Sequence, residues 1–420
     1  MPNGIGFYKS LESLFLSRFG LFCIYGKYMK KILVVFGTRP EAIKLIPVIR
    51  ELKKKADLKV TVCVFRQHKE MLDQILKPLG VEPDIDLKIS INDKDLFYRG
   101  AGFFTRIKTL IQSGLGFLRF IFILRQDKPD LLIVQGDTST VFLAAFFAYH
   151  FKISVAHVEA GLRTYDKYAP FPEEMNRQLL CRLADFNFAP TEIARKNLLS
   201  ESILPDRILV TGNTAIDALL QVSKRHEEPS VAKRWLEFFK KKYGLDLEAD
   251  RKIILVTAHR RESFGEGLKN IFSAIKEIAE RRRDVLLVYP VHLNPNVREL
   301  ARSILQGHPN ILLIEPVEYE PFIFLMKSAH FILTDSGGIQ EEAPSLNKPV
   351  LVMREKTERM EGVEIGASKL VGTDEKKIIA ATLELLDDPK AYASMTGKKN
   401  PYGDGNASVR IAEALVDYLK

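Results

Sequence analysis

The stretch ILTDSGGIQEEAPSL, residues 332–346, shows how the chain is built. An apolar run stops at Asp335, a serine and two glycines follow, and a helical pattern then opens with Gln340, Glu341 and Glu342. Acidic residues in a first helical turn suit the helix dipole in any protein. They also suit a nucleotide, because backbone N–H groups at a helix start bind phosphate and a carboxylate binds ribose hydroxyls. The stretch leaves both interpretations open, but it predicts a strand followed directly by a helix.

Short β-rich runs alternate with helix-length amphipathic segments along the chain. Such alternation predicts a parallel sheet with helices on both faces. Two sets of strands, separated by a polar stretch at residues 224–250, predict an α/β protein with two Rossmann-like domains. We expect the first domain at residues 30–211 and the second at 212–405, with helix 406–420 packing back on the first. The expected strands are residues 31–36, 59–65, 131–135, 154–159, 186–189, 208–211, 253–257, 285–291, 311–314, 331–334 and 350–353.

The composition of the 420 residues, 46% hydrophobic and 27% charged, is typical of a soluble globular protein with two sizeable cores. The formal net charge is +9. Because the basic residues are scattered among acids, we expect a small polyanionic substrate and no nucleic-acid partner. Cys23, Cys63 and Cys181 are odd in number and far apart, which favours a reducing cytosol. The histidines lack metal-ligand spacing, so we expect no metal.

Two apolar segments need separate interpretation. In residues 1–29 an apolar patch is interrupted by Arg18 and no cleavage-site pattern follows, so we expect a poorly ordered N-terminal extension and not a signal peptide. Residues 103–126 are rich in Phe, Leu and Ile, but basic residues leave no uncharged run of about eighteen residues. A packed helix with a basic outer face is the favoured interpretation and peripheral membrane contact the alternative. Neither predicts stable membrane insertion.

Ligands of doubly wound sheets bind beyond the carboxyl ends of the strands, so the residues that follow each strand are candidates. The first strand runs into GTRPEAIK, residues 37–44, in which Pro40 fits a first helical turn. Arg39 and Lys44 oppose the helix dipole there, so either they bind an anion or Arg39 is merely paired at the surface. The segment is neither a Walker loop nor G-x-G-x-x-G, which argues against a dinucleotide cofactor.

Three carboxylates stand at strand ends or helix starts in the first half of the chain. Asp137 follows the third strand, where N-capping of the next helix is the commonest use of Asp. Alternation along the next strand puts His157 and Glu159 on one face at its carboxyl end. Glu173 lies in the first turn of a further helix. Each has a structural explanation, but together Asp137, Glu159 and Glu173 indicate acid–base machinery that converges on one cleft.

Basic and small residues follow the strands of the second half. His259 comes directly after a strand, where it donates to a phosphate, shuttles a proton or serves as a core histidine. Arg359 is a further candidate contact for phosphate or sugar. The pattern predicts cations beside a leaving phosphate and carboxylates elsewhere in the site.

The motifs GTRPEAIK, QGDTST, HVEAGLRT, PEEMNR, HRRESFG, YPVHLNPNV and TDSGGIQEEAPSL occur in this order. With them the chain, from about residue 30 to its C-terminus, resembles the bacterial non-hydrolysing UDP-N-acetylglucosamine 2-epimerases. The resemblance implies two Rossmann-like domains of the glycosyltransferase-B type with an active site in the interdomain cleft. It also implies a cytoplasmic homodimer that interconverts UDP-N-acetylglucosamine and UDP-N-acetylmannosamine without a cofactor, for bacterial surface polysaccharide.

Carried over by motif, the resemblance assigns individual residues. The glycine turn would hold the diphosphate, Glu342 the ribose and Phe322 the uracil. Val317 stands where some members have Gln near the uracil, and residues 67–70 read Gln-His-Lys-Glu where regulated members have Gln-His-x-Gln. Activation by a second UDP-N-acetylglucosamine therefore stays open. The implied catalytic residues are Asp137, Glu159, Glu173 and His259, and the implied substrate-binding residues are Arg39, Lys44, Phe322, Ser336, Gly337, Gly338, Glu342 and Arg359.

The implied chemistry explains these residue types. The C2 proton of the sugar is not next to a carbonyl, so we expect elimination of UDP to 2-acetamidoglucal and re-addition with a proton delivered to the opposite face. That route needs at least two acid–base groups and stabilisation of the departing diphosphate. The alternatives are an epimerase for a modified UDP-2-acetamido sugar, a hydrolysing epimerase, a glycosyltransferase of the same architecture and a non-catalytic UDP-sugar sensor. The carboxylates of the first half argue against the last two.

Overall fold

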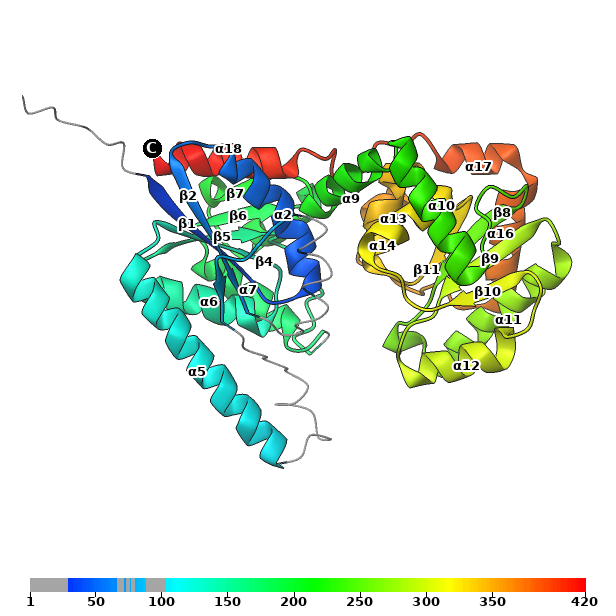
Figure 1. Cartoon of the computed structure of the whole chain (residues 1–420), viewed down its shortest axis with the longest axis horizontal. Helices are drawn as coiled ribbons and strands as arrows, with labels where there is room; N and C mark the ends of the chain where they lie inside the picture. Colours follow the sequence, from blue (N-terminus) through cyan, green and yellow to red (C-terminus); the bar gives the residue numbers. More distant parts are fainter. Residues whose placement is uncertain (1–28, 66–71, 73–75, 77–79, 88–102, 169) are drawn as a thin grey trace, which may run out of the picture.

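The structure, a computed structural model, describes residues 29–65, 72, 76, 80–87, 103–168 and 170–420, with side chains of the long helix from residue 114 onward. The expectations for residues 1–28 and 67–70 lie outside this part of the chain. Within the described residues the strands form two parallel sheets, one of seven strands and one of six. Helices pack around each sheet (Figure 1), which confirms the predicted α/β fold with two Rossmann-like parts.

The first sheet and its helices form what we call the first lobe. Its strands are β1 (Lys30–Phe36), β2 (Leu58–Val64), β3 (Ile85–Asp86), β4 (Leu131–Gln135), β5 (Ser154–Val158), β6 (Phe186–Ala189) and β7 (Ile208–Val210). In space their order is β3-β2-β1-β4-β5-β6-β7. Successive strands are added on one side of β1 up to β3 and on its other side from β4 onward, so the order of the strands reverses between β1 and β4. Doubly wound sheets bind ligands at such a reversal. Arg39 follows β1 and Asp137 follows β4, so these two candidate residues flank it.

The second sheet and its helices form the second lobe, which repeats this arrangement. Its strands are β8 (Lys252–Thr257), β9 (Val285–Pro290), β10 (Ile311–Ile314), β11 (Phe331–Thr334), β12 (Val350–Val352) and β13 (Ser368–Leu370). The spatial order β10-β9-β8-β11-β12-β13 reverses between β8 and β11. His259 follows β8 and Ser336 follows β11, so the second lobe also has candidate residues on both sides of its reversal.

Helices precede or follow most strands. In the first lobe they are α2 (Arg39–Lys53), α5 (Phe103–Asp127), α6 (Ser139–His150), α7 (Glu173–Leu183), α8 (Glu192–Ser200) and the 3-10 turn η1 (Pro205–Arg207). In the second they are α10 (Pro229–Tyr243), η2 (Arg261–Ser263), α11 (Glu266–Arg281), α12 (Pro295–Leu305), α13 (Tyr319–Ser328), α14 (Gly337–Glu342), η3 (Ala343–Leu346), α15 (Met360–Glu364), α16 (Glu375–Asp387) and α17 (Pro389–Met395). Helix α9 (Thr214–Arg225) runs between the lobes, and helix α18 (Ala407–Leu419) lies on the first lobe.

Central strands are apolar throughout because helices cover both of their faces. In β1, Ile32 and Val34 pack into one hydrophobic cluster, whereas Leu33 and Val35 pack into another. Alternation of side chains across a strand explains this division. The predicted strands agree with the observed ones to within one residue, but β3 and β13 were not predicted. Two or three residues are too short a run for a periodic signal.

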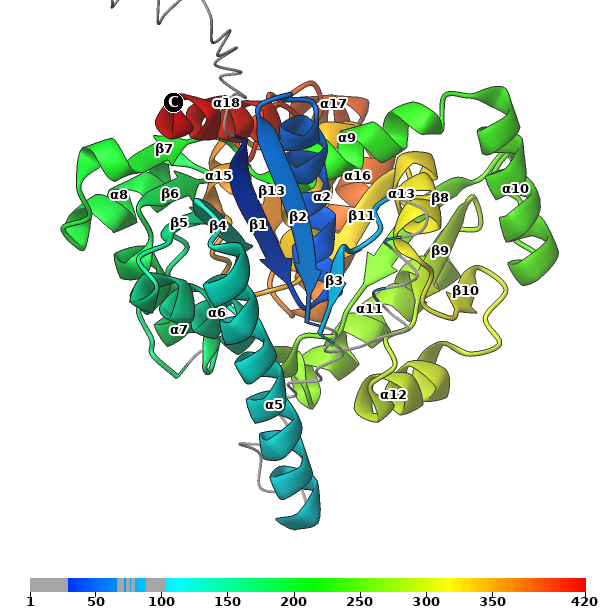
Figure 2. The same cartoon turned by 60° about the vertical axis from the view of Figure 1, so that its left-hand side comes forward.

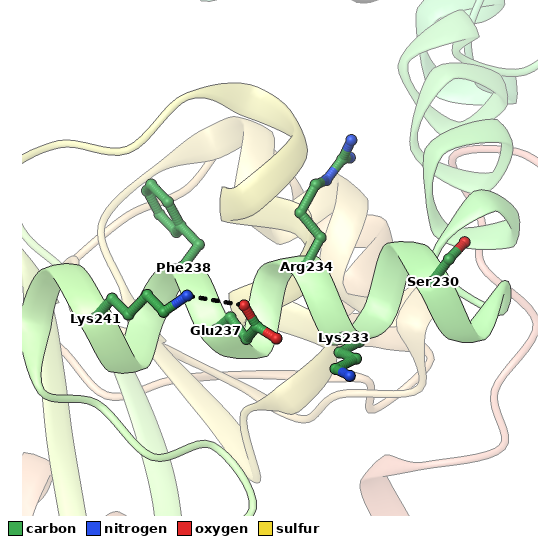
Figure 3. Close-up of a pocket in the computed structure, with 6 residues that line it drawn as sticks. All are labelled: Ser230, Lys233, Arg234, Glu237, Phe238 and Lys241. Atoms are coloured by element: carbon green, nitrogen blue, oxygen red, sulfur yellow. Dashed lines mark hydrogen bonds and ion pairs between the residues drawn. The ribbon is translucent and has the colours of Figure 1, made fainter.

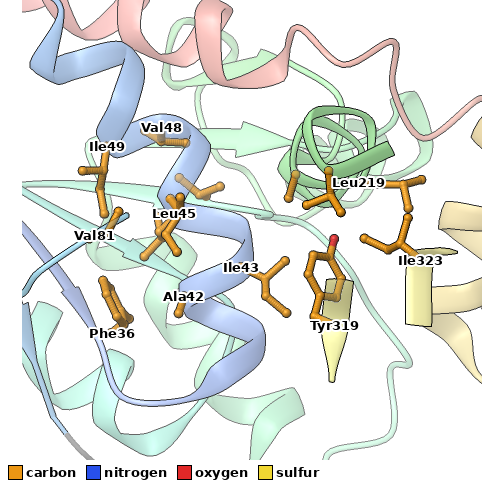
Figure 4. Packing of buried hydrophobic residues seen from close by; sticks show 14 of the residues in the cluster. Phe36, Ala42, Ile43, Leu45, Val48, Ile49, Val81, Leu219, Tyr319 and Ile323 are labelled. Atoms are coloured by element: carbon orange, nitrogen blue, oxygen red, sulfur yellow. The ribbon is translucent and has the colours of Figure 1, made fainter. Parts of the chain in front are cut away.

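Helix α9 joins the hydrophobic interiors of the two lobes. It contacts α2 and α13, and its Leu219 lies in one buried cluster with Ile43 and Tyr319 (Figure 4). Helix α18 then returns to the first lobe and contacts α2 and α9. The buried carboxylate of Asp217 in α9 accepts a hydrogen bond from Ser408 N of α18 at 2.7 Å. The domain limits drawn from the sequence remain a proposal.

Helix α5 extends away from the rest of the first lobe (Figure 2). Its described part has exposed apolar residues, Leu115, Leu118 and Phe122. Among the described residues, we find no helix with the length and apolar character that crossing a membrane requires.

Candidate active site

The carboxylate of Glu159 follows β5 and is held by donors from three different segments. Its Oε2 accepts hydrogen bonds from Lys44 Nζ and Gln135 Nε2, and its Oε1 accepts one from Asn213 Nδ2 at 3.4 Å. Burial raises the pKa of the Glu159 carboxyl, but the charge and hydrogen bond of Lys44, with nearby arginines, outweigh burial and lower it overall. Glu159 is therefore an ionised carboxylate that is only 9% exposed.

The backbone at Glu159 departs from the predicted strand. Strand β5 ends at Val158, and Glu159 has φ = 66°, a left-handed conformation that is uncommon for a residue other than glycine. His157 is fully buried, its Nε2 lies 2.9 Å from Gly136 O, and burial lowers its pKa to about 4. The predicted alternation therefore does not extend to Glu159, and His157 is a core histidine.

Asp137 lies at the turn between β4 and α6 and forms an ion pair with Arg177 of α7. The interpretation of Asp137 as an N-cap is wrong, because Thr138 caps α6 and accepts a hydrogen bond from Val141 N at 3.4 Å. Glu173 is the first residue of α7, one turn before Arg177. The structure thus brings the Asp137 turn to the helix that carries Glu173.

A buried carboxylate fixes the turn that carries Arg39. Glu41 is 3% exposed, and its Oε2 accepts hydrogen bonds from Gly37 N at 2.6 Å and Thr38 N at 3.0 Å. Its Oε1 accepts a bond from Thr138 Oγ1 at 2.7 Å. Glu41 therefore ties the turn after β1 to the turn after β4, on the two sides of the sheet reversal.

In the second lobe, the fully buried Asp335 organises the residues after β8. Its Oδ2 accepts hydrogen bonds from the backbone N–H groups of His259, at 2.6 Å, and Arg260, at 2.7 Å. Nδ1 of His259 lies 3.4 Å from Oδ1 of Asp335, and the imidazole stacks on His292 with ring centroids 5.0 Å apart. Burial lowers the pKa of His259, so a neutral imidazole is held in a fixed orientation near neutral pH.

The turn of Ser336, Gly337 and Gly338 lies against Arg359. A Cβ on Gly337 would lie 2.9 Å from Arg359 Cζ, so the absence of a side chain lets the guanidinium approach the turn. Arg359 Nε donates a hydrogen bond to Glu341 Oε1 at 2.9 Å. Burial would lower the pKa of Arg359, but nearby carboxylates, Glu341 first, raise it overall. A permanent cation thus lies beside the backbone N–H groups that begin α14.

Arg39 interacts with carboxylates of the opposite lobe. Burial lowers its pKa, and the charges of Glu318 and Glu342 oppose that change. Burial, and then the charge of Glu341, raise the pKa of Glu342 to about 8. Phe322 lies on α13 and is half-buried against the hydrophobic cluster that joins the lobes. These candidate residues therefore lie where the two lobes meet.

Residues that the sequence did not single out complete the arrangement. Asp335 could have been found, because it follows a strand beside a sheet reversal as Asp137 does. The others gave no local signal, since their roles depend on partners far along the chain. They are Gln135, Arg177 and Asn213. Glu341 was noted as an acid of a first helical turn, but it lies near the end of α14 and pairs with Arg359.

A surface hollow along α10 is not part of this site (Figure 3). Its described lining comes from one helix, and Glu237 pairs with Lys241 at 3.0 Å. It is a solvated helix face with interleaved charges. The lining residues are Ser230, Lys233, Arg234, Glu237, Phe238 and Lys241.

Comparisons with known proteins agree with this architecture. A family model described as UDP-N-acetylglucosamine 2-epimerase matches residues 50–416. The UDP-N-acetylglucosamine 2-epimerase of Yersinia pestis is 50% identical over 389 residues, which cover 92% of this chain and 99% of the relative. That of Escherichia coli K12 is 50% identical over 385 residues, which cover 92% and 98%.

Two solved structures are also similar. The crystal structure of the Neisseria meningitidis UDP-GlcNAc 2-epimerase bound to UDP-GlcNAc has a TM-score of 0.80 and 45% identity, and the match covers 92% of this chain and all of that one, 100%. The Methanocaldococcus jannaschii enzyme in complex with UDP-GlcNAc and UDP has a TM-score of 0.72 and 36% identity, with coverage of 92% and 99%. With its fold and these relatives, the chain belongs to the UDP-N-acetylglucosamine 2-epimerase family of isomerases.

Proposed function

We propose that the chain interconverts UDP-N-acetylglucosamine and UDP-N-acetylmannosamine at the junction of the two lobes. The observation that carries the proposal is a hydrogen-bonded path across this junction. Glu159 and Glu341 accept from the same amide, that of Asn213, and Glu341 holds Arg359 beside the glycine turn. The candidate acid–base group Glu159 and the cation Arg359, which lies at the candidate anion-binding turn, therefore belong to one cluster. The relatives crystallised with UDP-GlcNAc support this choice of substrate.

In the proposed complex, the second lobe holds the UDP half of the substrate. The backbone N–H groups of the glycine turn bind the diphosphate, and Arg359 neutralises its charge. With its Nδ1 beside Asp335, His259 donates Nε2–H to a phosphate oxygen as the imidazolium, a form that the charge of the bound diphosphate favours. Arg39 reaches the diphosphate from the first lobe. The remaining assignments are Ser336, Gly337 and Gly338 to the diphosphate, Glu342 to the ribose, Phe322 to the uracil and Lys44 to the sugar side.

The proposed reaction is an elimination followed by an addition. A carboxylate removes the proton from C2, the electrons of the C2–H bond form the C1–C2 double bond, and the C1–O bond breaks with its electron pair remaining on UDP. UDP then returns to C1 of 2-acetamidoglucal while an acid delivers a proton to the other face of C2. We assign these proton transfers to Asp137 and Glu159, with Glu173 assisting. Charge that develops on UDP is stabilised by the cations and N–H groups of the diphosphate site.

The proposal extends to the assembly, the location and the role of the protein. We propose a cytoplasmic homodimer that supplies UDP-N-acetylmannosamine for bacterial surface polysaccharide. Leu115, Leu118 and Phe122 of α5 are 58%, 63% and 62% exposed, and apolar residues exposed on a long helix favour contact with another chain. Light scattering during size-exclusion chromatography tests this, and a monomer at micromolar concentration would contradict it.

A sigmoidal dependence of rate on UDP-GlcNAc would support a second, activating molecule of substrate.

One incubation tests the central claim. Purified protein is incubated with UDP-GlcNAc in D2O, without acceptor or nicotinamide, and the products are analysed by NMR and mass spectrometry. Deuterium at C2 and a mixture of two intact UDP-sugars are expected, because protonation of the glucal takes its hydrogen from solvent. Free UDP as the main product would favour the hydrolysing alternative. Exchange only with a UDP-2-acetamido sugar altered at C3 or C6 would favour the alternative substrate.

A further inference from the structure

Asn213 stands where the chain leaves the first lobe. Its backbone N–H donates to Tyr402 O at 2.6 Å, on the segment that returns from the second lobe. Its side-chain Oδ1 accepts a hydrogen bond from Ala215 N at 2.9 Å and caps α9. The backbone and one side-chain atom are therefore fixed, and the orientation of the Nδ2 group follows from them.

The Nδ2 group of Asn213 lies between two buried carboxylates, one from each lobe. It donates to Glu341 Oε2 at 2.8 Å and to Glu159 Oε1 at 3.4 Å. The other oxygen of Glu159 is held by Lys44 and that of Glu341 by Arg359. The result is a continuous chain of five side chains, buried at Glu159, Asn213 and Glu341 and partly exposed at the two cations, in which a neutral amide joins the halves.

An amide has the chemistry that this position requires. It carries two N–H donors, one for each carboxylate, and adds no charge. An aspartate there would put a third carboxylate beside the other two, which raises the free energy of the ionised state. The amide of Asn213 also donates to Glu341 independently of Arg359. When Arg359 turns toward a diphosphate, Glu341 therefore keeps a hydrogen bond and is not left buried without a partner.

We propose that Asn213 is a positioning residue, whose amide sets the distance between the Glu159 carboxylate and the diphosphate-binding lobe by holding Glu159 and Glu341 together. The proposal rests on the proposed function, because it assumes that Glu159 acts on a sugar attached to a diphosphate. It assigns no contact between Asn213 and the reacting atoms.

Asn213→Asp separates this role from capping. Aspartate keeps an oxygen for Ala215 N and is as good an N-cap as asparagine, but it donates nothing to the carboxylates. The charged groups around the position are Lys44, Glu159, Arg177, Glu341 and Arg359. Without substrate, we expect the thermal midpoint of the variant to fall below that of the wild type by an amount that grows between about pH 5 and about pH 8, as the carboxylates ionise.

Two further variants make this measurement decisive. Asp388→Asn makes the reverse change at the exposed N-cap of α17, whose Oδ1 accepts from Lys390 N at 2.8 Å, and its difference from the wild type should not grow between about pH 5 and about pH 8. Adding Glu341→Gln to Asn213→Asp exchanges donor and acceptor, so the double variant should regain most of the lost midpoint. A pH-independent effect of Asn213→Asp, or a double variant no more stable than the single one, would overturn the proposed bridge.

The catalytic consequence is measured by C2 deuterium exchange. In Asn213→Asp we expect kcat to fall by about 10²-fold, as for a misplaced catalytic group, with KM within about threefold. The acid limb of the rate–pH profile should move to higher pH, because the added carboxylate raises the pKa of its neighbours. An unchanged rate and profile would overturn the positioning role even where the thermal data match. Absence of exchange in the wild type would count against the proposed function alone, since the thermal measurements test the bridge without substrate.

Discussion

The two lobes organise the charges of the site in different ways. In the first lobe, Glu159 and Asp137 are each paired with a cation of the same lobe, Lys44 and Arg177. In the second, Asp335 is buried and bonds to backbone N–H groups. The first arrangement places a cation beside each of these candidate carboxylates before a substrate arrives. Each lobe has a buried acid that fixes a backbone turn, Glu41 in the first and Asp335 in the second, and Asp335 in addition lies beside the imidazole of His259. The difference is consistent with our proposal of a proton-transfer half in the first lobe and an anion-binding half in the second.

The largest effect is expected from Glu159→Gln, which removes the charge of the proton-transfer half. C2 exchange should fall by about 10³-fold or more, the upper range for a missing general base, while UDP affinity stays within about threefold. Isotope exchange and calorimetry measure the two quantities. Glu201→Gln is the matched control, because this carboxylate of the same lobe pairs with Arg163 at 2.6 Å and has no assigned role in the site. Exchange within tenfold of wild type would remove Glu159 from the mechanism.

Asp335→Ala should act on the opposite half. It removes the single oxygen, Oδ2, that accepts from the backbone N–H groups of both His259 and Arg260, so both residues lose their fixed orientation. We expect UDP to bind about 10²-fold more weakly and the protein to lose about 1–3 kcal/mol of stability, as for an unsatisfied buried group. Calorimetry with UDP and denaturant unfolding measure these effects. Unchanged UDP affinity would break the distinction between the lobes.

Gly337→Ala tests the contact between the glycine turn and Arg359. The new Cβ would lie 2.9 Å from Arg359 Cζ, so the guanidinium must shift and its bond to Glu341 is strained. We expect UDP affinity to fall by about tenfold, equivalent to about 1.4 kcal/mol. A Cβ on Gly338 meets no protein atom within 4 Å, so Gly338→Ala should leave the thermal midpoint of the unliganded protein unchanged. An equal loss of midpoint in both variants would contradict this explanation.

The last prediction concerns thermal stability, which depends on the protonation of Glu342. Its pKa is raised from an ordinary 4.5 to about 8 in the folded protein, so the folded state binds a proton that the unfolded state releases. Stability from this group is therefore lost as pH rises from about 4.5 to about 8. Glu342→Gln should melt with the wild type near pH 4 and above it near pH 8, where the shift corresponds to up to about 5 kcal/mol. A constant difference between the two proteins across this range would contradict the raised pKa.

The sequence predicted the fold better than the site. Apolar runs such as β1 and β4 were placed within one residue, because strands buried on both faces are hydrophobic along their whole length. Candidate residues were found where they directly follow such strands, as Arg39, Asp137 and His259 do. Glu159 was found by alternation along a predicted strand, although the strand ends one residue earlier and the backbone of Glu159 turns into the left-handed region.

By itself the sequence determined the alternation of strands and helices and the residues at the strand ends, because periodicity and turn chemistry act over a few neighbouring residues. Only the tertiary structure decided which of those residues meet. Asn213 bonds to Glu341 at a sequence separation of 128 residues, and Lys44 pairs with Glu159 at a separation of 115. Such pairs depend on how two sheets are packed through α9, which no local pattern encodes. The ionisation of the site is therefore a property of the folded chain.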